Sequence, residues 1–355
     1  MRGISVYLGE GSATELEPYI EKVRKLGFAS IFTSLHIPEE DPSLYEERLR
    51  ELGTLARKYD MELMADISPK SLGHLGFTWA NAEGLVDWGV SGLRIDYGID
   101  EAVIAELSGK MKIALNASTL TKEGLAKLKA AGLRTEAVEA WHNFYPRPET
   151  GLDTQEFFKV NEWLKAEGLS VMAFVPGDGK LRGPLFEGLP TLEGHRAVSP
   201  LAAYAALEKS GLVDKILVGD ITLSEGSLAQ FAAYEEGVIQ LRAESLTENG
   251  EVLEIASRVH TNRLDAARDV VRSMESREYG LFGTHRLHPE ETTERTKGSI
   301  TIDNERYGRY QGELQITKRN LPADGKVNVI GKVCQEDLAL IEHIRSGVKF
   351  QLVWV

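Results

Sequence analysis

The sequence has few of the features that mark disulfide-stabilised, membrane-embedded or nucleic-acid-binding proteins. Cys334 is its one cysteine, which excludes an intrachain disulfide and a cage of cysteines around a metal. No apolar run approaches the length of a membrane span, and the strand-like start, residues 3–8, carries no signal-peptide pattern. With 41 basic and 54 acidic residues the formal net charge is -13, which disfavours DNA but permits a small anion in a local pocket. We therefore expect a cytoplasmic protein without nucleic-acid or membrane partners.

The first two-thirds of the chain repeat one pattern, in which a short apolar strand is followed by a loop and an amphipathic helix. The chain has 355 residues and is 42% hydrophobic, which suits one large domain and one small domain. Most of the strand candidates are rich in β-branched residues, as strands buried on both faces are. They span residues 3–8, 30–34, 62–67, 92–96, 112–116, 138–141, 171–175 and 215–218.

Turn and cap residues divide the pattern into units. Thr121, Asp153 and the pair Ser199-Pro200 predict helix starts, and Gly132 and Gly211 are typical of helix ends. Eight units predict a (β/α)8 TIM barrel over residues 1–236. A doubly wound open sheet is the alternative, but it predicts a glycine-rich phosphate loop after the first strand. The segment 9–12 matches that loop only in part, because the third glycine is missing.

After about residue 236 the alternation of strands and helices stops. Residues 237–355 therefore form a second, mainly β domain, with apolar and polar residues alternating as in antiparallel strands. Helices are expected at 264–275 and 336–344, and strands at 238–245, 252–260, 298–303, 312–318, 326–333 and 349–355.

Polar side chains follow most of the barrel strands, where the active sites of such barrels lie. Carboxylates at several strand ends suit glycoside hydrolysis, because one carboxyl group protonates the leaving oxygen while another acts as nucleophile or base. Singly, each carboxylate is also compatible with a helix cap or a pair with an arginine. These strand-end residues are His36, Asp66, Asp96, Asn116, Asp178 and Asp220.

The loop after the sixth strand, residues 141–153, has the richest mixture of chemical groups. His142 and Asn143 offer an imidazole and an amide, Arg147 a cation and Glu149 a carboxylate, while Tyr145 adds a flat apolar face. That mixture suits a polar, ring-shaped, anionic ligand. The long loop after the seventh strand, residues 179–196, adds the cationic donors Lys180, Arg182, His195 and Arg196.

Three long segments, residues 142–152, 182–193 and 307–316, resemble the bacterial 6-phospho-N-acetylmuramidases, long known only as an outer-surface-protein-like family of unknown function. The resemblance implies a barrel followed by a cyclophilin-like β domain, with no cofactor. It also implies cytoplasmic hydrolysis of the β-1,4 bond of N-acetylmuramic acid 6-phosphate–N-acetylglucosamine during cell-wall sugar recycling. Arg309, in the third segment, is a candidate to close the site over the barrel mouth.

We therefore expect a glycosidase that acts on a small phosphorylated amino-sugar disaccharide. Asp96 and Glu149 are the preferred catalytic pair, with Asp66 and Asp178 in reserve. The candidates for substrate binding are His36, Asn116, His142, Asn143, Tyr145, Arg147, Arg182, Glu187, His195, Arg196 and Arg309.

Two other functions fit the same residues. A metal-dependent phosphosugar isomerase or aldolase would use oxygen and imidazole ligands, and a non-catalytic sugar-phosphate-binding protein would bind without turnover. The metal ligands of the first alternative would be His36, Asp66, Asp96, His142 and Asp220.

Overall fold

The computed structural model of the chain describes residues 1–355 except 36, 38–41, 96–98 and 277–285. The chain divides into two compact units, Met1–Glu225 (unit 1) and Gly226–Val355 (unit 2). The domain boundary expected after residue 236 stays a prediction. The division into units places helix α8 (Glu225–Glu235) almost wholly in unit 2.

Unit 1 is a closed barrel of eight parallel strands in sequence order, which confirms the predicted barrel and excludes the open sheet. Four of the strands have the predicted bounds, because their apolar runs are flanked by clear turn residues. The strands are β1 (Arg2–Ser5), β2 (Phe28–Ser34), β3 (Glu62–Ile67), β4 (Gly92–Ile95), β5 (Lys112–Asn116), β6 (Val138–Trp141), β7 (Ser170–Val175) and β8 (Lys215–Val218).

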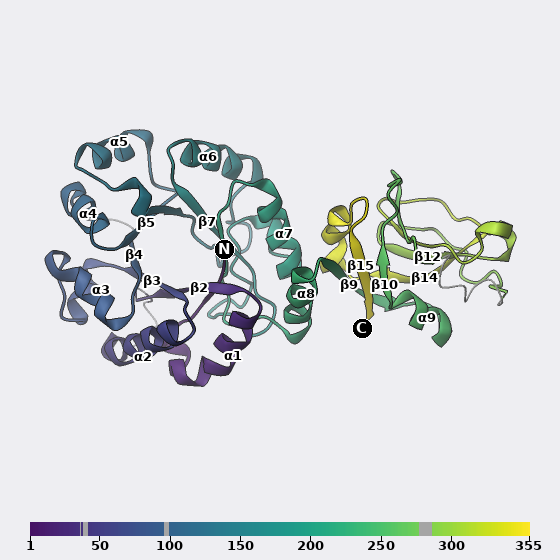
Figure 1. Cartoon of the computed structure of the whole chain (residues 1–355), viewed down its shortest axis with the longest axis horizontal. Helices are drawn as coiled ribbons and strands as arrows, with labels where there is room; N and C mark the ends of the chain where they lie inside the picture. The colour runs from purple at the N-terminus through teal and green to yellow at the C-terminus, as the bar shows by residue number, and fades with distance from the viewer. Residues whose placement is uncertain (36, 38–41, 96–98, 277–285) are drawn as a thin grey trace. The chain divides into compact units, whose positions relative to one another are not determined.

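Helices connect the strands and surround the barrel (Figure 1). A short helix and a longer 3-10 segment, η3 (Trp79–Trp88), share the connection between β3 and β4. None of the described helices is long and apolar enough to span a membrane. The α-helices of unit 1 are α1 (Ala13–Lys25), α2 (Tyr45–Lys58), α3 (Pro69–His74), α4 (Glu101–Ser108), α5 (Lys122–Ala130), α6 (Thr154–Ala166) and α7 (Pro200–Ser210).

The predicted helix starts are confirmed by their hydrogen bonds. The Thr121 hydroxyl accepts from the Gly124 N–H, and the Ser199 hydroxyl accepts from the Ala202 N–H. The Asp153 carboxylate accepts from two backbone N–H groups in the first turn of α6. Such bonds satisfy donors that have no partner within the helix, so the caps fix where the loops that precede these helices end.

The barrel interior is layered, because alternate residues of each strand point inward. The middle layer is apolar and includes Phe32, Met64, Ala114, Trp141, Met172, Phe174 and Leu217. This packed layer separates the polar side chains at the amino ends of the strands from those at the carboxyl ends.

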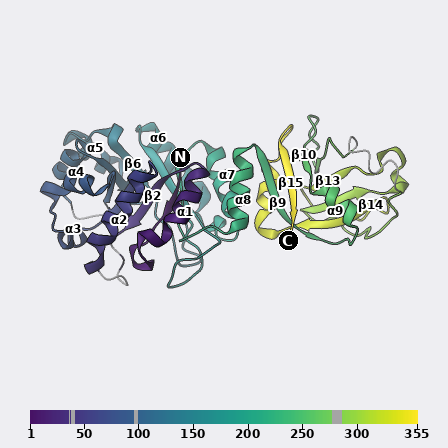
Figure 2. The same ribbon diagram turned by 60° about the horizontal axis from the view of Figure 1, so that its bottom comes forward.

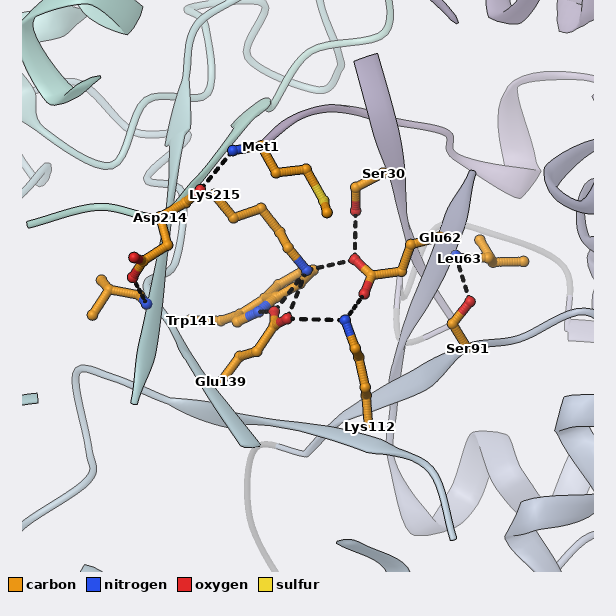
Figure 3. A network of polar contacts seen from close by, with 11 residues as sticks. Met1, Ser30, Glu62, Leu63, Ser91, Lys112, Glu139, Trp141, Asp214 and Lys215 are labelled. Atoms are coloured by element: carbon orange, nitrogen blue, oxygen red, sulfur yellow. Dashed lines mark hydrogen bonds and ion pairs between the residues drawn. The ribbon is translucent and has the colours of Figure 1, made fainter. Parts of the chain in front are cut away.

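The layer at the amino ends is an ionic network of two carboxylates and two lysines, shown in Figure 3. The Lys215 ammonium bonds both Glu139 oxygens, at 2.9 and 2.7 Å, and also contacts Glu62. Lys112 pairs with Glu62 as well, and the Trp141 indole N–H donates to Glu139 at 2.6 Å. Burial raises the pKa of Glu62, but Lys215 and Lys112 outweigh it and the net pKa is lowered. The network closes the amino end of the barrel with its charges balanced.

Unit 2 contains a seven-stranded sheet in the order β10-β15-β9-β14-β12-β13-β11. Strands β9, β10, β14 and β15 of this sheet are labelled in both Figures 1 and 2. All neighbouring strands are antiparallel except β15 and β9, whose parallel pairing the sequence did not indicate. The elements are β9 (Val238–Ser245), α9 (Gly250–Ala256), β10 (Val259–Thr261), β11 (Val270–Arg272), β12 (Ser299–Asp303), η6 (Glu305–Tyr310), β13 (Leu314–Thr317), β14 (Val327–Val333), η7 (Gln335–His343) and β15 (Lys349–Trp354).

Two predictions for unit 2 are wrong. The expected strand 252–260 is mostly helix α9, because Asn249 caps the Val252 N–H and the apolar residues recur at helical spacing. The expected helix 264–275 instead contains strand β11, which pairs with β13. Leu264 is 76% exposed, so the apolar position that suggested a helix face there is not buried.

Asp303, the last residue of β12, carries a buried carboxyl group that makes the stability of unit 2 depend on pH. Burial, with smaller contributions from Glu313 and Asp324, raises its pKa from 3.8 to about 7. The stability that comes from the neutral carboxyl is therefore fully present below 3.8 and is lost as the pH rises through about 7.

We expect Asp303→Asn to remove this dependence. The difference between the free energies of unfolding of the variant and the wild type should be about 2 kcal/mol larger at about pH 8 than at about pH 5, in favour of the variant. Urea titrations at the two pH values measure the difference, with the exposed Glu336→Gln as a control. Parallel pH profiles for Asp303→Asn and wild type would contradict the prediction.

Candidate active site

The polar layer at the carboxyl ends of the strands is built around one buried ion pair. Asp66 and Arg94 lie two residues beyond the inward positions Met64 and Gly92, so their side chains also point into the barrel. Arg94 Nη1 donates to Asp66 Oδ1 at 3.0 Å, and the two side chains are 7% and 16% exposed. The Ser34 hydroxyl donates to the other Asp66 oxygen at 3.2 Å. The pair therefore holds the Asp66 carboxylate in a fixed position at the barrel mouth.

Arg94 also connects this pair to the loop after β6. Its Nη2 donates to the Asn143 side-chain oxygen. The Arg94 guanidinium, from β4, therefore connects Asp66 of β3 to Asn143 in the loop after β6. The Asn143 carbonyl accepts from the Thr191 hydroxyl at 2.8 Å, which ties the β6 loop to the β7 loop. The arrangement orients the Asn143 amide group, whose NH2 can donate to an oxygen of a ligand. Sequence reasoning missed Arg94, although a charged residue inside an apolar strand is a signal of this kind of pair.

Arg196 holds the β6 and β7 loops together, and its role in substrate binding stays a prediction. Its Nε and Nη2 donate to the two Glu193 oxygens at 2.7 Å each. Its Nη1 and Nη2 also donate to the backbone carbonyls of Glu187, Gly188, Tyr145 and Arg147. All five N–H groups of a guanidinium are therefore used inside the protein.

Glu193, the partner of Arg196, also binds the β6 loop; the Arg196–Glu193 pair is called the clamp below. Its carboxylate accepts from the backbone N–H groups of Glu149 and Gly151, at 2.9 and 2.7 Å. Arg196 first, and then these two N–H groups, lower the pKa of Glu193 to about 2 against the effect of burial. Glu149 itself has a left-handed backbone conformation (φ +71°) and an exposed side chain, so the clamp fixes its backbone and leaves its carboxylate in solvent.

We expect Arg196→Gln to loosen both loops. The loss of a two-pronged ion pair and of several carbonyl contacts should lower the free energy of unfolding by about 1–2 kcal/mol. Hydrogen exchange should speed up in residues 145–151 and 187–193 and stay unchanged around β3. Arg147→Gln, which removes an exposed guanidinium from the same loop, is the control. Unchanged exchange in both loops would show that Arg196 does not hold them.

Asp220, after β8, organises the long β7 loop. It is fully buried, and its carboxylate accepts from the backbone N–H groups of Gly177, Leu189 and Arg182 at 2.9, 3.0 and 3.1 Å. Burial raises the pKa of Asp220, and the three N–H donors oppose that shift. The Arg182 guanidinium lies over the rings of Tyr7 and Phe144, 4.4 and 5.7 Å from their centroids. The β7 loop therefore places Arg182 beside Phe144, the residue after Asn143.

Two histidines that the sequence suggested as ligand-binding groups are neutral; His142 is buried and His195 is half-buried. His142 faces α6, where its Nε2 contacts the Asn161 side-chain oxygen at 2.7 Å and its ring lies 4.6 Å from that of Phe157. Burial lowers the pKa of His142 and of His195 to about 4 in each case. At neutral pH neither ring is therefore a cation for a phosphate, and a role of either histidine in substrate binding stays a prediction.

The remaining candidates are spread over the loops. Asp178 accepts two hydrogen bonds from Ser224, at 2.9 and 2.8 Å, and so fixes the chain ahead of α8. Asn116 is buried at the end of β5, and the Tyr145 hydroxyl lies 3.5 Å from that of Ser118. Arg147 and Glu187 are exposed on the β6 and β7 loops.

Of the other three candidates, one belongs to unit 2 and two lie outside the described residues. In unit 2, Arg309 donates to the Tyr310 hydroxyl at 2.9 Å, and its role above the barrel stays a prediction. His36 and Asp96 lie outside the described residues. Within the part of the chain that is described, no group of three or more His, Cys, Asp and Glu side chains is arranged to hold a metal ion.

Comparisons with known proteins agree with this architecture. Two family models match the chain, "6-phospho-N-acetylmuramidase, N-terminal" over residues 2–233 and "6-phospho-N-acetylmuramidase, C-terminal" over residues 239–353. A search of curated proteins found no match. A crystal structure of a conserved Enterococcus faecalis protein of unknown function is 46% identical, with a TM-score of 0.89 over 100% of this chain and 96% of that one.

An uncharacterised Bacillus cereus protein is more distant but has the same extent. It is 27% identical, with a TM-score of 0.72 over 99% of each chain. The two family models together span both units and leave only short segments unmatched. The chain thus belongs to the 6-phospho-N-acetylmuramidase family.

Proposed function

We propose that this chain hydrolyses the glycosidic bond of N-acetylmuramic acid 6-phosphate–N-acetylglucosamine and releases the two monosaccharides. The family indicates a glycosidase that acts on a phosphorylated muramic acid sugar. The observation that carries the proposal is the cluster of Asp66, Arg94 and Asn143, because it sets an oriented carboxylate at the carboxyl ends of the barrel strands. By the family resemblance we also propose a cyclophilin-like fold for unit 2 and a cytoplasmic role in cell-wall sugar recycling.

Asp66 is proposed to act in its anionic form. A carboxylate that is held by a guanidinium is suited to stabilise the positive charge that develops on the sugar ring, or to act as nucleophile or base. The Asn143 amide is suited to donate to a hydroxyl or acetamido oxygen of the substrate, since Arg94 fixes its orientation. Tyr145, on the same loop, supplies an aromatic face for a sugar ring.

A second carboxyl group must protonate the leaving oxygen. We propose Asp96 or Glu149 for this role, as the sequence suggested. Glu149 has an exposed side chain on a loop whose backbone Glu193 fixes, whereas Asp96 is outside the described residues. Asp178 is less suited, because Ser224 occupies both of its oxygens.

The test is to incubate the purified protein with the phosphorylated disaccharide and with its unphosphorylated counterpart, and to identify the products by mass spectrometry. We expect the phosphorylated disaccharide to be cleaved into two monosaccharides, and the unphosphorylated one to be cleaved far more slowly. Binding of the phosphorylated disaccharide without cleavage would contradict the proposal and favour a sugar-phosphate-binding protein.

A further inference from the structure

A second feature of unit 1 is a pocket of about 360 Å³ beside the barrel mouth. It lies between the loops that follow β1, β2 and β7, so it opens on the face of the barrel that carries the active site. Its polar lining includes Arg48 from α2, Arg182 from the β7 loop and Glu10 from the β1 loop. Leu44 and Tyr45, at the start of α2, also line it.

The pocket has an excess of positive charge. Glu10 is paired with Lys180, whose ammonium lies 2.8 Å from its carboxylate, so these two residues cancel. For Arg48 and Arg182, no carboxylate among the residues that the structure describes is within ion-pair distance. The buried Asp220 offsets part of the Arg182 charge, so among the described residues the lining keeps a positive excess, in a chain whose formal net charge is -13. The positive end of the α2 dipole adds to this potential.

Both guanidiniums are held in place by contacts that leave some of their N–H groups for a ligand. Arg48 donates through one terminal nitrogen to the Leu8 carbonyl, which anchors it against the β1 loop. Arg182 lies flat over Tyr7 and Phe144, and the buried Asp220 holds its backbone N–H. A guanidinium has five N–H donors, so each can still present a pair of them to a phosphate. Side chains that are fixed before binding lose little entropy on binding.

The pocket is next to the proposed catalytic cluster. Arg182 contacts the ring of Phe144, which follows Asn143 in the chain. Asn143 in turn accepts a hydrogen bond from Arg94. From this geometry we infer that the pocket binds the phosphate group of the sugar, with Arg48 and Arg182 as its ligands. The inference rests on the proposed function for the identity of the sugar, but a site for a phosphate monoester can be tested without turnover. It adds Arg48, which the sequence did not suggest.

The first experiment measures the binding of inorganic phosphate by titration calorimetry at constant ionic strength. We expect Arg48→Gln and Arg182→Gln each to raise the Kd for phosphate about tenfold or more, since each removes a charge-assisted contact. Arg48→Lys keeps the charge but not the two-pronged geometry, so its Kd should lie between those of wild type and Arg48→Gln. Arg50→Gln, on the same helix, is the matched control, because Arg50 pairs with Glu46 and stacks on Trp88.

The second experiment compares kcat/KM for the phosphorylated and unphosphorylated disaccharides. Arg48→Gln should lower the preference for the phosphorylated disaccharide about tenfold, and Arg50→Gln should keep it. A Kd for phosphate that is the same in Arg48→Gln, Arg182→Gln and wild type, with circular dichroism showing folded protein, would overturn the inference. The inference would also be overturned if Arg48→Gln and Arg182→Gln lost the binding of lactate but bound phosphate as tightly as wild type. The pocket would then bind the lactyl carboxylate of the sugar.

The two proposals fail in different ways. If wild type cleaves neither disaccharide but binds phosphate through Arg48, the proposed reaction is wrong and the phosphate site stands. If wild type cleaves the phosphorylated disaccharide and its phosphate affinity does not depend on Arg48 or Arg182, the reaction stands and this phosphate site is wrong.

Discussion

Asp66→Asn is expected to lower kcat/KM for the phosphorylated disaccharide by about a thousandfold or more, which corresponds to about 4 kcal/mol of transition-state stabilisation. The substitution keeps the shape of the side chain and removes the negative charge that the proposal places against the developing positive charge on the sugar. KM should change far less than kcat, because the charge on the ring is largest in the transition state. Steady-state kinetics on the purified variant measure both effects.

The control for this variant is Asp60→Asn, which changes an exposed carboxylate just before the same strand. It should retain the activity of the wild type. A kcat/KM for Asp66→Asn within about threefold of wild type would remove Asp66 from the chemistry, whatever the outcome for other residues.

The same kinetics can identify the residue that protonates the leaving oxygen. Asp96→Asn and Glu149→Gln should be compared on the natural disaccharide and on an aryl glycoside with an acidic leaving group. A leaving group that departs without a proton makes the general acid unnecessary, so the variant of the true acid should recover activity on the aryl glycoside alone. Full activity of both variants on the disaccharide would exclude both residues.

Among the variants proposed for stability measurements, Lys215→Met is expected to lose the most, about 3–5 kcal/mol in the free energy of unfolding. Lys215 is 4% exposed and bonds the carboxylates of Glu62 and Glu139. Its removal leaves the buried Glu139 with only the Trp141 N–H and the more distant Lys112 ammonium, 3.6 Å away. Urea titrations at neutral pH measure the loss. It should shrink on acidification, because protonation removes the charge from the carboxylates that are left.

Lys112→Met is the matched comparison, since Lys112 pairs with Glu62 and lies 3.6 Å from Glu139 but is 44% exposed. Its loss should be about 1 kcal/mol, as for a solvent-accessible pair. The double variant Lys215→Met with Glu139→Gln should be more stable than Lys215→Met alone, because no unpaired charge stays on Glu139. Equal losses for Lys215→Met and Lys112→Met would contradict the view that burial makes Lys215 the more important lysine of the network.

The barrel was predictable from the sequence because its strands are short apolar runs with clear boundaries. Strands β3, β5, β6 and β8 have the predicted ends, and the capping residues Thr121 and Asp153 are placed correctly. Unit 2 was harder, since short apolar segments fit either a helix or a strand. In α9 the cap at Asn249 and the helical spacing of Val252 and Ile255 were present in the sequence but were outweighed by alternation.

The candidate site was predictable only in part, because a strand-end position does not tell where a side chain points. Asp66 and Asn143 lie together at the mouth, while His142 is on the same loop as Asn143 but faces α6. Charge alone also does not tell which donors a protein uses internally, as Arg196 donates to Glu193 and to backbone carbonyls. Arg94 was missed because its partners are far away in sequence: Asp66 is its register partner on the adjacent strand β3, and Asn143 follows β6.

Hydrolysis of the phosphorylated disaccharide in ¹⁸O-labelled water, with mass spectrometry of both products, shows which bond the protein cleaves and whether water is the acceptor. We expect wild type to release N-acetylglucosamine without label and N-acetylmuramic acid 6-phosphate with one ¹⁸O at its anomeric carbon, and Asp66→Asn to release almost none of either. An intact disaccharide after prolonged incubation with wild type, or cleavage without incorporation of ¹⁸O, would contradict the proposed function.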